Sequence, residues 1–265
     1  MRIIFYAILF LIYIPCACAF PPGAQAIGCN SVLFDFRPML LDVSPDGFGE
    51  FKLYSGNWWD KYPYTTKYLS DDDEGALIIG LNGSVASTNR ASQRGVLPLL
   101  SGQKSFYVEF DARISSRGAD HWPALWLMPV EHDAKQSDHF ERDPDKFERW
   151  LEIDIDEGGF SSGTHGVAIS WSGIWPNYVR KISKDPHDNT TLDRTIYHQF
   201  GISFDSSNLS IEWWLDGKRM HKTNSGNVPE ISRYHNYYLI MSAQSHSLNL
   251  DYNFLVKRVY ACASF

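Results

Sequence analysis

Positive charge is scarce in this chain. Its 24 Lys and Arg residues stand against 31 Asp and Glu residues, which gives a net charge of −7 at pH 7. Proteins that bind nucleic acid neutralise its phosphates with clustered basic side chains. The balance therefore argues against a nucleic-acid partner, and it favours a neutral substrate over a polyanionic one.

Long apolar runs are scarce as well. The one clear run, Ile3 to Ile14, follows Arg2 and leads into small residues that end at Ala19. It is short for a membrane span and typical of a secretory signal. We predict a signal peptide over residues 1–19, with an uncleaved anchor as the alternative, and one secreted, extracellular, monomeric domain over residues 20–265. No later stretch is apolar enough to predict a membrane contact.

Cysteine is sparse, with four in the chain, two of which fall in the predicted signal peptide. The remaining two, Cys29 and Cys262, would reach an oxidising compartment. We predict that they form a disulfide that joins the N- and C-terminal strands. Three sequons fit a secreted chain and are predicted to carry glycans: Asn82, Asn189 and Asn208.

Helical periodicity is absent, whereas alternation typical of strands is frequent. Residues Ser105 to Ser115 alternate cleanly, and Asp216-Gly217 is a hairpin-turn signal. The polar segment Glu131 to Arg149 is predicted to be a long surface loop. Further strands are predicted at Tyr197–Phe204, Leu209–Leu215, Tyr237–Ser242 and Phe254–Ala261. With 15% aromatic residues and nine Trp, an all-β chain of this kind suits a site that stacks flat sugar faces.

The most informative stretch is Trp150 to Glu157 (WLEIDIDE), in which acidic and aliphatic residues alternate. Alternation places Glu152, Asp154 and Asp156 on one face of a strand. Neighbouring like charges repel and drive pKa values apart, which is typical of functional sites. The alternative is a solvated edge strand with its charges directed outward.

Other chemistries lack their signatures around this strand. No His or Cys residues stand there in metal-ligand spacing, and no calcium loop with its required glycine occurs. The nearby serines lack the context of a nucleophile elbow. We therefore expect no metal and no cofactor. Paired carboxylates remain, and these are what glycosidic hydrolysis requires.

Spacing indicates which carboxylates form the pair. Glu152 and Glu157 are five residues apart and face opposite sides of a regular strand, but one bulged residue between them would return Glu157 to the Glu152 face. The carboxylates would then be roughly 5 Å apart, near the separation of retaining enzymes. Asp156 needs no bulge, but its shorter side chain leaves a wider gap. We favour Glu157 over Asp156.

Residues 152–157 (EIDIDE) resemble the E-x-D-x-x-E signature of glycoside hydrolase family 16, in the bulged form of its laminarinase-like members. Supporting segments occur in the family's order: Phe106–Arg113, Gly118–Pro129 (GADHWPALWLMP), His198–Lys218 with its W-x-x-D-G hairpin, and Val256–Tyr260. The resemblance covers roughly residues 105–260.

The resemblance implies a concanavalin A-like β-jelly-roll sandwich with a concave sugar cleft, and retaining, endo-acting cleavage of a β-1,3- or mixed β-1,3/1,4-linked polysaccharide. Carried over by position, Glu152 is the nucleophile, Glu157 the acid/base, and Asp154 the residue that hydrogen-bonds and tunes the nucleophile. No cofactor is implied.

The remaining site residues are weaker candidates. We expect Trp122 and Trp171 to stack on sugar and Arg94 to contact substrate, with core packing or a solvated surface as the alternatives. Trp126 is expected in the core. Two other functions stay open: a glucan transglycosylase, which shares the covalent intermediate, and a non-catalytic β-glucan-binding recognition protein on the same fold.

Overall fold

The computed structural model describes residues 20–56, 65–89, 95–118, 120–133, 137–158, 163, 166–184, 192–223, 226–245 and 251–265. The predicted signal peptide, Arg94 and the sequon at Asn189 lie outside these ranges. Asn82 and Asn208 are both exposed, and their glycosylation stays a prediction. Among the described residues, no helix combines the length and the apolar character that a bilayer crossing requires.

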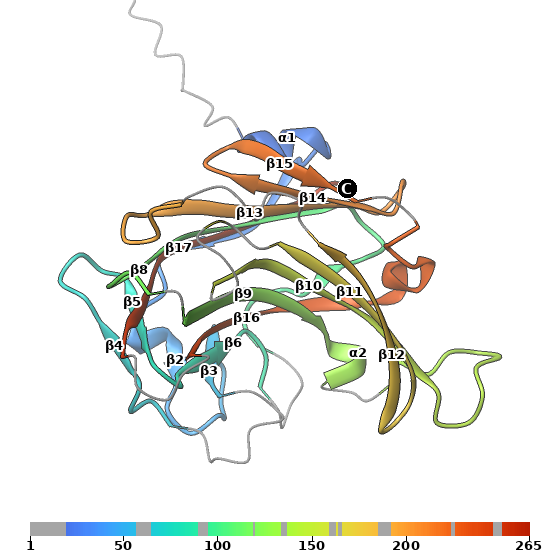
Figure 1. Ribbon diagram of the computed structural model, residues 1–265, viewed down its shortest axis with the longest axis horizontal. Coiled ribbons are helices and arrows are strands. Elements are labelled where there is room, and N and C mark those ends of the chain that lie inside the picture. Colours follow the sequence, from blue (N-terminus) through green and yellow to red (C-terminus); the bar gives the residue numbers. More distant parts are fainter. Residues whose placement is uncertain are drawn as a thin grey trace, which may run out of the picture.

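Two β-sheets lie over one another as layers (Figure 1). Sheet A has the order β15-β14-β13-β8-β17-β5-β4, with β1 also paired to β17. Its strands are β1 (Ser31–Phe36), β4 (Leu69–Asp71), β5 (Leu77–Gly80), β8 (Phe106–Ile114), β13 (His198–Asp205), β14 (Ser210–Leu215), β15 (Lys218–Lys222) and β17 (Asn253–Ala263).

Sheet B has the order β12-β11-β10-β9-β16-β6-β3-β2, with β7 also paired to β16. Its strands are β2 (Val43–Ser44), β3 (Leu53–Ser55), β6 (Ser84–Ala86), β7 (Leu100–Ser101), β9 (His121–Pro129), β10 (Glu148–Glu157), β11 (Val167–Ile174), β12 (Asn177–Lys184) and β16 (Asn236–Ser245). Its central strands arch, with the hollow side turned away from sheet A (Figure 1). We call this side the outer face of sheet B.

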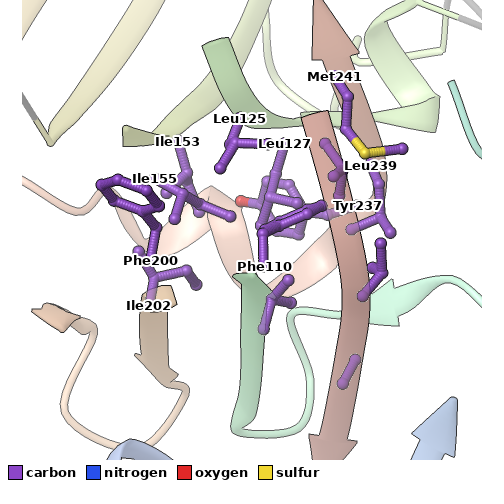
Figure 2. Packing of buried hydrophobic residues seen from close by; sticks show 14 of the residues in the cluster. Phe110, Leu125, Leu127, Ile153, Ile155, Phe200, Ile202, Tyr237, Leu239 and Met241 are labelled. Carbon is purple, nitrogen blue, oxygen red and sulfur yellow. The ribbon is translucent and has the colours of Figure 1, made fainter. Parts of the chain in front are cut away.

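The core lies between the sheets, where strand alternation directs one apolar face of each sheet inward. Figure 2 shows Phe110, Phe200 and Ile202 of sheet A against Ile153 and Ile155 of β10. All five are buried, and burial of each such side chain contributes about 1.5–3 kcal/mol. The predicted all-β jelly-roll sandwich is confirmed.

The strongest strand predictions hold closely, because period-2 alternation was clearest there. The strand expected over residues 105–115 is β8, and the acidic strand is β10. The expected loop over residues 131–149 begins instead with a short helix, α2 (Val130–Asp133), and ends inside β10. The other helices are also short: α1 (Pro22–Ala26) and 3-10 turns at Leu40–Asp42 and Glu230–Tyr234.

The predicted disulfide is present. Cys29 and Cys262 are bonded, with Cα atoms 5.9 Å apart. Cys262 lies on β17, and the Asn30 backbone N–H donates to the Ala263 carbonyl oxygen at 3.1 Å. The bond closes a loop of 233 residues, for which the chain-entropy model gives about 5 kcal/mol of stabilisation. It links the N-terminal segment to β17, which is the last strand of the chain and lies inside sheet A.

Candidate active site

Strand β10 contains the predicted bulge. On the neighbouring strand β9, Asp154 pairs with Trp126 and Asp156 pairs with the next residue, Leu125. Ile155 is therefore the extra residue, and it packs into the core. One extra residue reverses the face on which every later side chain emerges. Glu157 therefore lies on the same face as Glu152.

The residues before the bulge divide cleanly between the two faces. Leu151 and Ile153 belong to the core between the sheets. Trp150 instead belongs to a separate apolar cluster on the outer face, with Met128 of β9 and Ile240 of β16. Glu152 and Asp154 alternate with the core residues, so their carboxylates share the outer face with Trp150.

Asp156 takes the opposite direction. Its carboxylate accepts two hydrogen bonds from Arg194, one to Oδ2 from Nη1 and one of 2.8 Å to Oδ1 from Nη2. The guanidinium also lies over the ring of Phe200, a core residue of sheet A, 5.6 Å from its centroid. Arg194 Nη2 further donates to the Gly163 carbonyl oxygen at 2.9 Å. Arg194 thus links Asp156, next to the bulge, to the backbone at Gly163.

The Asp156–Arg194 pair is buried, with side-chain exposures of 3% and 11%. We therefore expect Asp156→Ala to lower the free energy of unfolding by about 3–5 kcal/mol, because the variant leaves a buried guanidinium without its partner. Urea unfolding measures the change. Asp145→Ala, at an exposed position, is the matched control and should change stability by less than about 0.5 kcal/mol. Equal effects of the two substitutions would show that the ion pair does not stabilise the strand.

Two tryptophans contact the proposed catalytic glutamates. Trp171 Nε1 donates to Glu152 Oε2 at 2.7 Å, and Trp122 Nε1 donates to Glu157 Oε1 at 3.1 Å. Both indoles are partly buried and were expected from the sequence to stack on sugar. The structure gives them a direct contact with the carboxylates, and charge-assisted bonds of this kind orient an ionised group.

Trp171 also belongs to a stack of rings on the outer face. Its ring is parallel to Trp150, with centroids 5.7 Å apart, and Trp150 is parallel to His132 at 3.5 Å. Trp150 and Trp171 are direct cross-strand partners on β10 and β11. The stack restricts the indole that holds Glu152.

The expectation that Trp126 lies in the core holds only in part, because Trp126 packs against an apolar cluster that is not the one between the sheets. Trp126 pairs directly with Asp154 across β9 and β10, so it shares the outer face with that carboxylate. It is partly buried and packs against the outer-face cluster that contains Trp150. The sequence motif WPALW gives the alternation of this strand, but it does not show which of its two faces turns inward.

Burial sets the electrostatics of the acidic residues. Burial raises the pKa of Glu152 to about 7, a rise that the hydrogen bond from Trp171 partly offsets and the Glu157 charge increases. Burial, with the charges of Glu152 and Glu157, raises the pKa of Asp154 well above its ordinary value. Asp154 is the more deeply enclosed of the two, at 2% exposure, and this burial favours the protonated form of its carboxyl group.

The backbone of Asp154 is held from the opposite sheet, because Trp213 Nε1 donates to its carbonyl oxygen at 2.9 Å. Its carboxyl atom Oδ2 is buried and has no hydrogen-bond partner among the described residues. A protonated Asp154 is therefore able to donate toward a neighbouring carboxylate or a bound hydroxyl.

Sequence reasoning missed two residues that organise this site. Arg194 carries no motif, and its pairing with Asp156 becomes visible only once the fold brings the two together across 38 positions. Trp150 was detectable in principle, since it stands two residues before Glu152 and therefore shares its face of the strand. One group of described residues could hold a metal: His132, Asp138 and Glu148, at the Trp150 end of the outer face.

No protein-family model and no curated protein matches the chain by sequence. Solved structures do match its fold. A glycoside hydrolase family 16 endo-glucanase from Bacteroides ovatus is 15% identical with a TM-score of 0.55, over 86% of this chain and 99% of that chain. An endo-1,3-β-glucanase from Streptomyces sioyaensis is 16% identical with a TM-score of 0.53, over 88% and 96%.

A third similar structure is an enzyme that acts on a different class of substrate. It is an endo-acting O-glycanase of the human gut microbiota, expressed to initiate mucin breakdown, and is 15% identical with a TM-score of 0.56, over 89% of this chain and 100% of that chain. Identity this low establishes architecture rather than substrate. This chain has the fold of the glycoside hydrolase family 16 endo-glucanases.

Proposed function

We propose that this chain is a secreted, retaining endo-β-glucanase that hydrolyses β-1,3- or mixed β-1,3/1,4-linked polysaccharide. The observation that carries the proposal is the bulge at Ile155, which brings Glu157 to the side of Glu152 and sends Asp156 to Arg194. Glycosidic cleavage requires two carboxylates beside the bond that breaks. Here the two lie on one face, and each accepts a hydrogen bond from an indole N–H. The endo-glucanases that share the fold support a glucan as the substrate.

In the first step, Glu157 donates its proton to the glycosidic oxygen while the ionised Glu152 attacks the anomeric carbon. The C–O bond of the leaving sugar breaks, and a glycosyl ester forms on Glu152. In the second step, Glu157 takes a proton from water, whose oxygen displaces Glu152 from the sugar. Asp154 holds its proton beside Glu152, and a hydrogen bond from it would steady the carboxylate as it leaves.

Trp122 and Trp171 have a double role in this proposal. Each orients a glutamate through Nε1 and presents an indole ring beside the reacting bond, where a sugar face is able to stack. Arg94, outside the described residues, remains a proposed substrate contact.

Retention of configuration is the first test. Two inversions at the anomeric carbon leave the released sugar in the β configuration. Proton NMR within the first minutes of hydrolysis should therefore show the β-anomer before mutarotation. Early accumulation of the α-anomer would contradict a glycosyl-enzyme intermediate on Glu152.

The pH profile is the second test. Glu152 attacks as a carboxylate, and since burial raises its pKa to about 7, kcat/KM should rise as pH increases through about 7 and fall below it. Trp171→Phe removes the hydrogen bond that lowers this pKa, so the rising limb should move to higher pH. The control is Trp175→Phe, at an indole that is 75% exposed. A limb near pH 4.5 that neither substitution moves would exclude Glu152 as the titrating group.

Substrate identity needs a panel of polysaccharides. We expect laminarin and mixed-linkage glucan to be cleaved internally, and mucin O-glycans, the substrate class of the O-glycanase relative, to be left intact. Product sizing by chromatography measures both. Exclusive cleavage of mucin glycans would keep the two-carboxylate chemistry and overturn the assigned substrate.

A further inference from the structure

His132, Asp138 and Glu148 come together at one end of the outer face. His132 lies on α2, Asp138 in the segment that follows, and Glu148 at the start of β10. Ligand atoms of the three lie within 4.8 Å of one another, and His132 Nδ1 is 2.8 Å from Asp138 Oδ2. Glu148 is four residues before Glu152 on the same strand, so this group lies roughly 13 Å along β10 from the nucleophile.

Asp138 is the most enclosed member of the group. Its side chain is 1% exposed, and its atom Oδ1 is buried without a hydrogen-bond partner among the described residues. A backbone bond from the Ser137 N–H to the Glu131 carbonyl oxygen, at 2.5 Å, fastens its segment to α2. An unsatisfied carboxylate oxygen in such a position is costly unless a cation or a donor reaches it.

The neighbourhood is also rich in negative charge. Within the described part of the chain, His132 lies 2.8 Å from Asp138 and 4.0 Å from Asp133, and neither carboxylate forms an ion pair with Lys or Arg. The third carboxylate, Glu148, accepts a hydrogen bond from the Tyr178 hydroxyl. One imidazole therefore faces three carboxylates, and a divalent cation would offset the excess negative charge.

We propose that His132 Nδ1, Asp138 and Glu148 bind a zinc ion. One imidazole with two carboxylates matches the mixed nitrogen and oxygen ligands of zinc, whereas calcium and magnesium favour sites built wholly from oxygen. Tetrahedral ligand atoms about 2.1 Å from zinc lie about 3.4 Å from one another. On binding, the 2.8 Å distance between His132 Nδ1 and Asp138 Oδ2 would therefore lengthen slightly, and the longest ligand–ligand distance, at most 4.8 Å, would shorten. Water fills the fourth position.

The surroundings of His132 suit a metal ligand. Its second nitrogen, Nε2, faces Asp133 Oδ1 at 4.0 Å, and Asp133 is fixed in turn by the Tyr238 hydroxyl at 2.6 Å. A carboxylate on the far side of a ligating imidazole selects its tautomer and orients its ring. The ring also stacks on Trp150. Zinc at this position would join α2, the following segment and β10, and would steady the ring stack that reaches Trp171.

This proposal departs from the metal-free site expected from the sequence, and it is independent of the proposed hydrolysis. The probe is zinc ion alone, titrated into tag-free full-length protein that has first been stripped with a chelator. We expect one equivalent to bind and the thermal unfolding midpoint to rise on addition of zinc. Cobalt should give the visible absorption of a tetrahedral site.

Asp138→Asn should weaken zinc binding by at least about 100-fold, because the substitution removes a ligand charge. Glu148→Gln, at a partly exposed position, should also weaken zinc binding. This second variant provides the test if Asp138→Asn does not fold. The matched control is His139→Ala, since His139 lies in the same segment but contacts the Phe147 carbonyl oxygen. It should bind zinc as the wild type does.

Three results would overturn the proposal: no saturable zinc binding, equal binding in the wild type and both ligand variants, or tight binding of calcium in preference to zinc. In the first case His132, Asp133 and Asp138 are a network of polar side chains that needs no metal ion.

Discussion

Replacing Glu152 with alanine is expected to lower kcat by on the order of 10⁵- to 10⁶-fold, the scale on which loss of a covalent nucleophile acts. The carboxylate sits on the outer face beside its indole donor at 2.7 Å, and it is the group proposed to form the bond to the sugar. Initial rates on the polysaccharide that the panel identifies give the measurement. Glu141→Ala, at an exposed glutamate, should keep wild-type activity.

The same variant separates the enzyme from the other functions. If the wild type binds glucan but does not cleave it, the chain is a recognition protein. Neither the wild type nor Glu152→Ala would then show hydrolysis. If the wild type instead transfers glucan to a sugar acceptor, the variant loses transfer and hydrolysis together, because both pass through the same ester. A folded Glu152→Ala protein with more than about a hundredth of wild-type activity would place the nucleophile elsewhere.

The sequence predicted the parts of the fold that depend on local pattern. Alternation at Phe106–Ile114 and at Glu148–Glu157 survives in β8 and β10, because each strand has one apolar face to bury. The bulge was also predictable, since Glu157 reaches the side of Glu152 only if one residue is added between them. The Cys29–Cys262 bond was predictable because only these two cysteines remain once the predicted signal peptide is removed, and an oxidising compartment favours their pairing.

Features that depend on distant partners were not predictable. Trp126 alternates like its neighbours, and only pairing with Asp154 shows that it faces outward. Short strands such as β2 and β7 carry too few residues for a period to be detected. The His132 cluster joins residues from a helix, a polar segment and a strand, and nothing in their spacing resembles a ligand motif.

Glu157→Ala carries the second large expected effect. Protonation of the leaving oxygen contributes about 10²- to 10⁴-fold, so hydrolysis of natural glucan should fall by that factor. Aryl glycosides with good leaving groups should lose far less in the first step, because they need no proton. Azide should then restore turnover and yield a β-glycosyl azide, since a small anion attacks the ester on Glu152 without a general base.

The control for this test follows from the buried ion pair. A loss of activity in Asp156→Ala could come from lost catalysis or from lost stability, because Asp156 is the buried ion-pair partner of Arg194. Asp156→Asn keeps the shape of the side chain and one acceptor for the guanidinium, so it tests the role of the charge in a better-preserved fold. With Asp156 directed to Arg194 rather than to the outer face, Asp156→Asn should show neither selective loss on natural glucan nor rescue by azide. If azide rescues Asp156→Asn while Glu157→Ala stays near wild-type activity, the proton donor is Asp156 and the bulge does not define the acid.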